Sequence, residues 1–354
     1  MNEIELQWDL GTAYDFFISL EVIHNPKRYG LRGSWAAGVR SRLPGPEREL
    51  LQRLINVTWP LHWVHALPAP KNCRTLLTAM EQLPPDQRLP ALIFGGPCSP
   101  NWTEPLLETA DRGSWSDADV DHLIALDPHQ KKGKKGKEQR EKAVKMLEIW
   151  ADAAEFEDGL AEAMRAYYDN FFAEEEIRIL PALQAALVNA QEMAAKLPIA
   201  DLMLNLSQGI LMTEWEDDKQ LVMIPSFWST PLMLFVPLDE RSEIRVFGAR
   251  PANASLVPGE VVPDALHLAL KTLADPTRLR ILRYLSDEAL TPAELARRLR
   301  LRPPTVIHHL DALRLARLVQ VTLSHEGRRY SARKEAIEDS CTMLENFLLK
   351  SDGD

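Results

Sequence analysis

Three helix-start signals near the carboxyl end of this 354-residue chain constrain its fold more than any other feature. Asp275-Pro276 offers an acceptor at the N-cap and a proline at the first helical position, where its missing N–H costs nothing. Thr291-Pro292-Ala293-Glu294 matches a capping box, in which two side chains satisfy each other's backbone N–H groups. Pro303 and Pro304 can only open a helix, because an interior proline removes a hydrogen bond. The sequence therefore predicts closely spaced helices that begin near residues 276, 291 and 303.

The third of these helices has one face suited to packing and another suited to a partner. At 3.6 residues per turn, Val306, Leu310 and Leu313 share the packing face. In a recognition helix, the exposed residues of the first two turns contact base edges in the DNA major groove. We therefore expect DNA contacts from Arg302, Pro303, Pro304, Thr305, Ile307 and His308.

A β-hairpin follows this helix. Residues 319–323 alternate in polarity as a strand does, His325-Glu326-Gly327 forms a turn, and Arg328-Arg329-Tyr330-Ser331 returns as the second strand. The position of Arg328 and Arg329 beside a recognition helix indicates a wing that contacts phosphates or a minor groove. The whole pattern predicts a winged helix-turn-helix domain.

Several segments carry a family resemblance, over roughly residues 264–350. They are Leu-Ala-Asp-Pro-Thr-Arg-Leu-Arg-Ile-Leu (273–282), Glu294-Leu295-Ala296, Thr305-Val306 with His309-Leu310, and Glu326-Gly327-Arg328-Arg329. Here the chain resembles the ArsR family of bacterial winged-helix repressors. The resemblance implies a homodimeric protein that binds double-stranded DNA. It also implies a repressor that an effector usually releases from the DNA.

The resemblance also implies where two copies of the chain would meet. The family dimerises through the helices that flank the winged helix, here about 264–273 and 335–349. The second of them carries an apolar stripe of the kind that a helix buries against a partner. The candidate dimer residues are Leu266, Leu270, Ile337, Cys341, Leu344, Phe347 and Leu348.

Metal sensing is not expected at the positions that metal-sensing members of the family use. Those members place cysteines on the helix that matches residues 291–300, or sets of Asp, His and Glu on the last helix. In this chain Cys341 stands alone on the last helix, and no histidine follows His325. We therefore expect neither a metal nor a cofactor.

Charge is distributed unevenly along the chain. Residues 271–334 contain 14 Lys/Arg and 6 Asp/Glu, whereas residues 1–270 contain 26 and 39. The formal net charge of −10 would argue against a nucleic-acid partner if it were uniform. Because the basic segment coincides with the DNA-binding pattern, it favours a phosphate-contacting surface over a merely solvated face.

Residues 1–255 are expected to form a sensor or regulatory region of mainly helical structure. Helical spacing dominates residues 1–205, as in Phe156, Leu160 and Met164. Between about 210 and 248, three short apolar runs separated by turns predict a small antiparallel β-meander, with residues 210–215 as a possible fourth strand. Residues 256–263 are a linker to the winged helix at 264–350 in this interpretation. The predicted fold class is α+β.

No catalytic motif is present in the sequence, so the chain is not expected to be an enzyme. Gly-x-Ser-x-Gly, His-Glu-x-x-His, a phosphate loop and Gly-x-Gly-x-x-Gly are all missing. An enzyme or a protein-interaction module tethered to a winged helix remains the alternative. The lysine-rich run Lys131–Lys137 is expected to lie in a solvated loop over 127–140, although it could touch DNA backbone.

The N-terminal region also contains all nine tryptophans of the chain. They could line a pocket for a small-molecule effector, although core packing is the simpler interpretation. The three cysteines are scattered. No apolar run is long enough to span a membrane, and no signal-peptide core appears. We therefore expect a cytoplasmic protein with no membrane association. The sequence favours a sequence-specific DNA-binding repressor whose N-terminal region senses a non-metal ligand or a protein partner.

Overall fold

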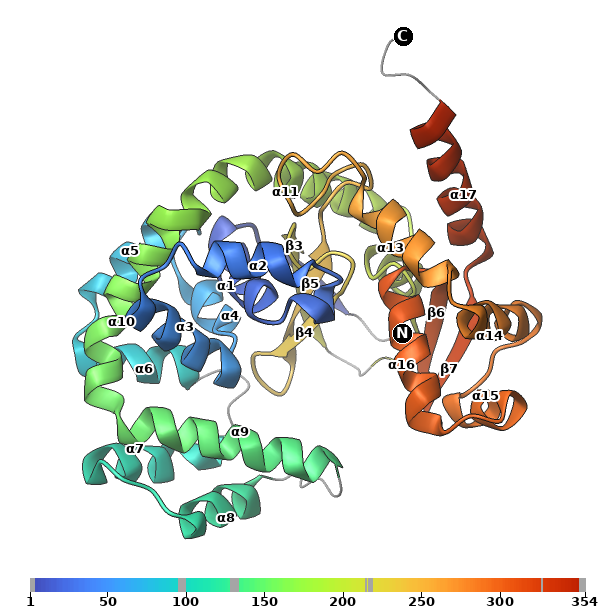
Figure 1. The fold of residues 1–354 in the computed structure, drawn as a ribbon. Helices are drawn as coiled ribbons and strands as arrows, with labels where there is room; N and C mark the ends of the chain where they lie inside the picture. The colour runs from blue at the N-terminus through green and yellow to red at the C-terminus, as the bar shows by residue number, and fades with distance from the viewer. Residues whose placement is uncertain are drawn as a thin grey trace.

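The computed structural model describes residues 4–94, 100–127, 134–213, 215, 219–325 and 327–349. A helical N-terminal region surrounds a four-stranded sheet, and a winged helix-turn-helix domain lies beside it (Figure 1). The helices of the N-terminal region are α1 (Thr12–His24), α2 (Gly33–Arg40), α3 (Gly45–Val57), α4 (Leu61–Ala66), α5 (Cys73–Gln82), α6 (Pro85–Ile93), α7 (Thr103–Arg112), α8 (Asp117–Leu126), α9 (Lys134–Ala151), α10 (Ala153–Tyr167), α11 (Ala173–Ala194) and α12 (Ile199–Leu206). Shorter helical turns span Pro26–Tyr29 (η1), Pro100–Trp102 (η2) and Tyr168–Phe172 (η3).

Helix α1 lies at the centre of the N-terminal region. Every residue from Thr12 to Ile23 is buried, which is the pattern of a helix covered on all sides. The aromatic rings of Phe16, Tyr167 and Phe172 pack edge to face or stack around it. The N-terminal region is therefore organised around this helix.

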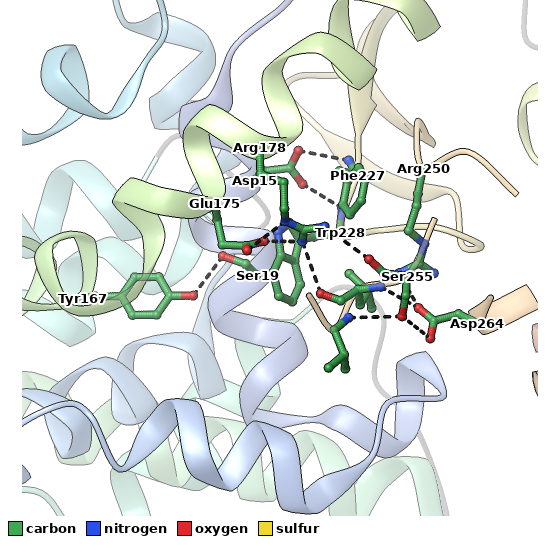
Figure 2. A network of polar contacts seen from close by, with 12 residues as sticks. Asp15, Ser19, Tyr167, Glu175, Arg178, Phe227, Trp228, Arg250, Ser255 and Asp264 are labelled. Carbon is green, nitrogen blue, oxygen red and sulfur yellow. Dashed lines mark hydrogen bonds and ion pairs between the residues drawn. The ribbon is translucent and has the colours of Figure 1, made fainter. Parts of the chain in front are cut away.

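A buried carboxylate joins α1 to the loop that follows strand β3 (Gln220–Ser226). Asp15 accepts hydrogen bonds from the Ser226 hydroxyl and from the backbone N–H groups of Phe227, at 3.0 Å, and Trp228, at 3.1 Å. Burial raises the pKa of Asp15 to about 6, although these hydrogen bonds favour its charged form. Figure 2 shows Asp15 within a wider polar network that continues to Arg250 and Asp264.

The main sheet is mixed, so the predicted antiparallel meander is wrong. The strand order is β1-β3-β5-β4, in which β1 (Glu5–Trp8) and β5 (Ser242–Gly248) both run parallel to β3. Only β4 (Leu234–Pro237) is antiparallel to its neighbour, β5. Strand β1 also lies at the beginning of the stretch 1–205, for which we expected helices.

The physical reason is that both faces of this sheet are covered. Strand β3 is buried at six consecutive residues from Leu221 to Ser226, which is typical of a parallel strand between two layers. Val222 and Ile224 face the large helical core, whereas Leu221 and Met223 pack with α12. The continuous apolar run at 221–224 is thus the signature of a doubly covered strand rather than of a meander strand.

The strand expected at 210–215 belongs to a different sheet. Strand β2 (Ile210–Met212) pairs in parallel with β6 (Val319–Ser324), which pairs antiparallel with β7 (Gly327–Ala332). The N-terminal region therefore supplies the third strand of the winged-helix sheet. The backbone N–H of Val321 donates to the carbonyl of Gly209 at 2.8 Å, and that of Thr213 donates to the carbonyl of Leu323 at 3.3 Å.

Gly209 is the residue that allows this pairing. Its φ of +126° is one that side-chain-bearing residues rarely adopt, and a Cβ there would lie 3.2 Å from the carbonyl oxygen of Val319. Arg333, which follows the wing, donates from Nη1 to the carbonyls of Gln208 at 2.7 Å and Arg317 at 3.1 Å. The chain before β2 is thereby held against the winged helix.

The structure also bears on the tryptophans and on the loop expected at 127–140. All nine tryptophans lie in the apolar cores or pack against them, so the core interpretation is confirmed. The expected loop at 127–140 is wrong from residue 134 onward, where α9 begins, and residues 131–133 lie outside the described part. Helix α9 is anchored by buried Met146 and Trp150 and by an ion pair of Arg140 with Asp117 at 2.6 Å.

We predict that Asp15 makes the stability of the protein fall between pH 4 and pH 7. The pKa of Asp15 is about 6 in the folded state, against 3.8 for an exposed aspartate in an unfolded chain. Between these values the unfolded state loses its proton more readily than the folded state, so a rising pH favours unfolding. Relative to Asp15→Asn, the free energy of unfolding of the wild type should fall by about 2–3 kcal/mol over this range. Urea denaturation at several pH values measures the difference. Exposed Asp111→Asn is the control, and a flat difference for Asp15→Asn would contradict the assignment.

We predict that Gly209→Ala lowers the free energy of unfolding by about 1–3 kcal/mol. A residue with a side chain is strained at the positive φ of Gly209, and its Cβ would lie too close to the carbonyl oxygen of Val319. Thermal and urea unfolding measure the change. Gly33→Ala is the matched control, because no atom lies within 4 Å of a Cβ at Gly33 and its φ is ordinary. Equal stability of the two variants would show that β2 tolerates displacement from β6.

Candidate nucleic-acid interface

The first two helices of the DNA-binding domain begin at the residues that the sequence indicates. Asp275 caps α14 (Pro276–Asp287) by accepting from the backbone N–H groups of Thr277, at 2.8 Å, and Arg278, at 3.0 Å. At the start of α15 (Pro292–Leu299), Thr291 accepts from the N–H of Glu294 at 3.2 Å, and Glu294 accepts from the N–H of Thr291 at 2.7 Å. These bonds lower the pKa of the Glu294 carboxyl group. The predicted capping box is confirmed.

The turn between α15 and the next helix is set by Arg300. This residue closes α15 in the left-handed conformation, with a φ of 56°, and the N–H of Leu301 donates to the carbonyl of Ala296 at 3.0 Å. Helix α16 (Pro303–Leu315) then begins with its two prolines in the first turn, as expected. The two helices and this turn form the helix-turn-helix.

Helix α16 divides into a buried and an exposed face. Val306, Leu310 and Leu313 are fully buried in the core of the domain. Ile307 is 44% exposed although it is apolar, and its neighbours on that side are exposed as well. We call this exposed set the recognition face: Arg302, Pro303, Pro304, Thr305, Ile307 and His308. The structure thus brings every residue predicted for base contact to one accessible surface.

The wing is a regular antiparallel hairpin attached to the helical core. Tyr330 of β7 is buried and exchanges backbone hydrogen bonds with Leu290, at 2.9 and 2.8 Å, which ties the wing to the start of α15. Arg328 and Arg329 are both exposed. Arg329 also donates to the carbonyl of Ala289 at 3.1 Å and lies 3.5 Å from the carboxylate of Glu294. Arg329 is therefore partly committed to the protein itself, although both arginines lie at the surface.

Positive charge without an internal partner is concentrated near the helix-turn-helix turn. Within the described residues, Arg297, Arg300 and Arg302 make no ion pair, whereas Arg298 pairs with Glu288 at 2.6 Å. Unpaired arginines on a surface can neutralise phosphates and release the counterions that surround DNA. These three arginines therefore make the region of the turn between α15 and α16 positively charged.

The flanking helices α13 (Asp264–Leu273) and α17 (Lys334–Leu349) pack beside each other. Leu266 is buried within the chain, and Ile337 packs on the core of the domain. Leu344 is half-buried and Cys341 is exposed. The remaining expected dimer residues expose apolar surface, with Leu270 at 40%, Phe347 at 38% and Leu348 at 66%.

Sequence reasoning missed the residues that join the two parts of the chain. Gly209 and Arg333 join the wing sheet to the N-terminal region. The expected linker at 256–263 is anchored at its first residue, because Leu256 is buried. The short apolar run Ile210-Leu211-Met212 after Gly209 was the available signal, but parallel pairing with a strand more than 100 residues away leaves no local pattern.

Within the part of the chain that the structure describes, no group of three or more His, Cys, Asp or Glu side chains could hold a metal ion. No helix there combines the length and the apolar character needed to cross a membrane.

Comparison with known proteins identifies the domain. The family model described as "Bacterial regulatory protein, arsR family" matches residues 275–321, which run from the cap of α14 into β6. The transcriptional repressor SdpR of Bacillus subtilis is 30% identical over 84 residues, which cover 24% of this chain and 93% of that protein. No solved structure matches the chain. Through its C-terminal winged helix-turn-helix, the chain belongs to the arsR family of bacterial regulatory proteins and is a DNA-binding transcriptional regulator.

Proposed function

We propose that this protein is a homodimeric repressor that recognises its operator through the recognition face of α16. The observation that carries the proposal is the accessibility of that face together with the unpaired arginines beside it. Repression, rather than activation, is supported by the name of the Bacillus subtilis relative, a transcriptional repressor.

Each residue of the recognition face has a chemistry that suits the major groove. Thr305 and His308 can exchange hydrogen bonds with base edges, and Ile307 can contact the methyl group of thymine. Arg302 can donate to a guanine or a phosphate. Arg328 on the wing reaches outward and suits a phosphate or a minor groove. Base discrimination would then come from α16, and most of the salt-dependent affinity from the arginines.

The homodimer is supported by the apolar surface that a single chain leaves open on α13 and α17. Leu270 and Phe347 are 40% and 38% exposed, and Leu348 and Leu349 are 66% and 80% exposed. Apolar side chains gathered at the end of one helix mark an interaction surface more often than isolated ones do. A second copy would bury them and place two recognition faces on successive major grooves.

We infer that the N-terminal region senses a non-metal ligand or a protein partner. This role is supported by its physical attachment to the wing through β2, because a rearrangement before residue 210 would move β6. The enzyme alternative gains no support from a specific observation.

We predict that His308→Ala and Arg328→Ala weaken DNA binding in different ways. His308→Ala should lose about 5–50-fold in affinity for duplexes selected by the wild type, with little loss on a scrambled duplex. Arg328→Ala should weaken both equally and reduce the slope of log affinity against log salt by about one. Fluorescence anisotropy over a salt series measures both effects. Arg74→Ala, an exposed change of the same charge in the N-terminal region, is the control. Identical losses on both duplexes for both variants would refute this division of roles.

We predict that Leu348→Asp shifts the protein from dimer to monomer, because a carboxylate would be buried in the shared apolar surface. Sedimentation equilibrium measures the assembly, and affinity for a duplex with two half-sites should fall at least tenfold. Ile177→Asp is the matched control, since Ile177 is an apolar residue of α11 that is 78% exposed. A wild type that sediments as a monomer would overturn the proposed dimer.

A further inference from the structure

A cavity of about 50 Å³ lies where the N-terminal region meets the DNA-binding domain. Its walls come from the residues around η1, the segment 250–257, the start of α13, and residues 315–317 at the end of the recognition helix. A volume of this size holds about three to five water molecules, or a compact solute of a few heavy atoms. No residue of the cavity was singled out by the sequence patterns.

The charged groups of the cavity are not balanced. Among its lining residues, Arg32 pairs with Glu260 at 3.3 Å and Arg250 pairs with Asp264 at 3.2 Å. The guanidinium of Arg317 makes no hydrogen bond or ion pair within the described part of the chain. The cavity therefore carries one arginine more than it has carboxylates.

Burial makes this excess charge costly. Burial and the positive charges of Arg250 and Arg333 lower the pKa of Arg317 to about 10. Burial likewise lowers the pKa of Arg250 to about 10, against the attraction of Asp264. A neighbouring anion would relieve the repulsion between these two cations.

Apart from His267, the rest of the wall is mainly apolar. Leu31, Leu268 and Leu315 line the cavity together with prolines, and Leu256 is buried beneath it. Such a wall favours a ligand with a short hydrocarbon part over a fully hydrated inorganic ion.

The two arginines belong to different parts of the protein. Arg250 is fixed from the N-terminal region, since its Nη2 donates to the carbonyl of Thr230 at 3.0 Å and its partner Asp264 accepts from Ser255 and Leu256, at 2.9 and 2.7 Å. Figure 2 shows Arg250, Asp264 and Ser255 together with Arg178, which donates to the carbonyl of Ser255 at 3.2 Å. Arg317 instead closes α16 in a left-handed conformation, with a φ of 62°. A ligand between them would touch the end of the recognition helix.

We propose that this cavity binds a small organic carboxylate with a short alkyl part, held by Arg317 beside Arg250, and that binding changes the affinity for DNA. The second half of this proposal rests on the proposed function as a DNA-binding regulator. The carboxylate supplies the missing negative charge and the acceptors, and the alkyl part contacts the leucines. Occupancy joins α16 to the N-terminal region, and this is how the site acts on the recognition face.

Isothermal titration calorimetry of the full-length protein without DNA tests the site, with propionate, inorganic phosphate and sodium chloride at equal ionic strength. Propionate should bind saturably, and chloride should not. Arg317→Gln should weaken propionate binding at least tenfold, as expected for the loss of a charge-assisted hydrogen bond, whereas Arg74→Gln should leave it unchanged. No saturable binding, or equal binding by Arg317→Gln, overturns the site. Tighter binding of phosphate than of propionate overturns the assignment of a carboxylate.

The melting temperature of Arg317→Gln separates a ligand role from a structural one. Because the Arg317 guanidinium makes no hydrogen bond or ion pair within the described residues, Arg317→Gln should not lower the melting temperature, yet propionate binding should weaken. A lower melting temperature with unchanged binding overturns the role of Arg317. Anisotropy on the selected duplexes with and without saturating propionate then tests the coupling. An unchanged DNA affinity overturns the coupling alone, and absent DNA binding both with and without propionate contradicts the proposed function alone.

Discussion

The parallel pairing of β2 with β6 is the interaction on which the architecture depends. It makes the wing sheet a shared structure, because its third strand comes from the N-terminal region. A free edge of β6 would expose unpaired backbone groups, and β2 satisfies them. Arg333 reinforces the pairing by bonding to carbonyls on both sides of the junction. The N-terminal region and the wing are therefore joined through one sheet.

Charge has a different role on the two sides of this junction. At the surface, the arginines around the start of α16 are exposed and make no ion pair. Water and salt screen their charges there, and DNA phosphates could take the place of that solvent. On the inner side, Arg250 and Arg317 are confined with too few carboxylates, so their repulsion is screened much less. Both groups adjoin α16, one at its first turn and the other at its last. The same helix thus connects a surface suited to DNA with a cavity suited to a small anion.

The N-terminal region supplies a rigid support for this arrangement. Its centre is α1, whose buried Asp15 fixes the loop after β3, and the polar network continues through Arg178 and Ser255 to Asp264. Buried networks of this kind hold one geometry, because each unsatisfied group would be costly. The position of Arg250 relative to α16 is therefore set by the core of the N-terminal region and not by a flexible linker.

The sequence by itself determined the DNA-binding domain, because its signals are local. Asp275, Thr291 with Glu294, and the prolines at 303 and 304 act within one helical turn, and the periodicity of α16 separates its buried from its exposed face. Only the tertiary structure decided the mixed sheet, the pairing of β2 with β6 and the meeting of Arg250 with Arg317. These contacts join residues distant in the chain, and such contacts depend on how whole layers pack rather than on the residues next to them in sequence.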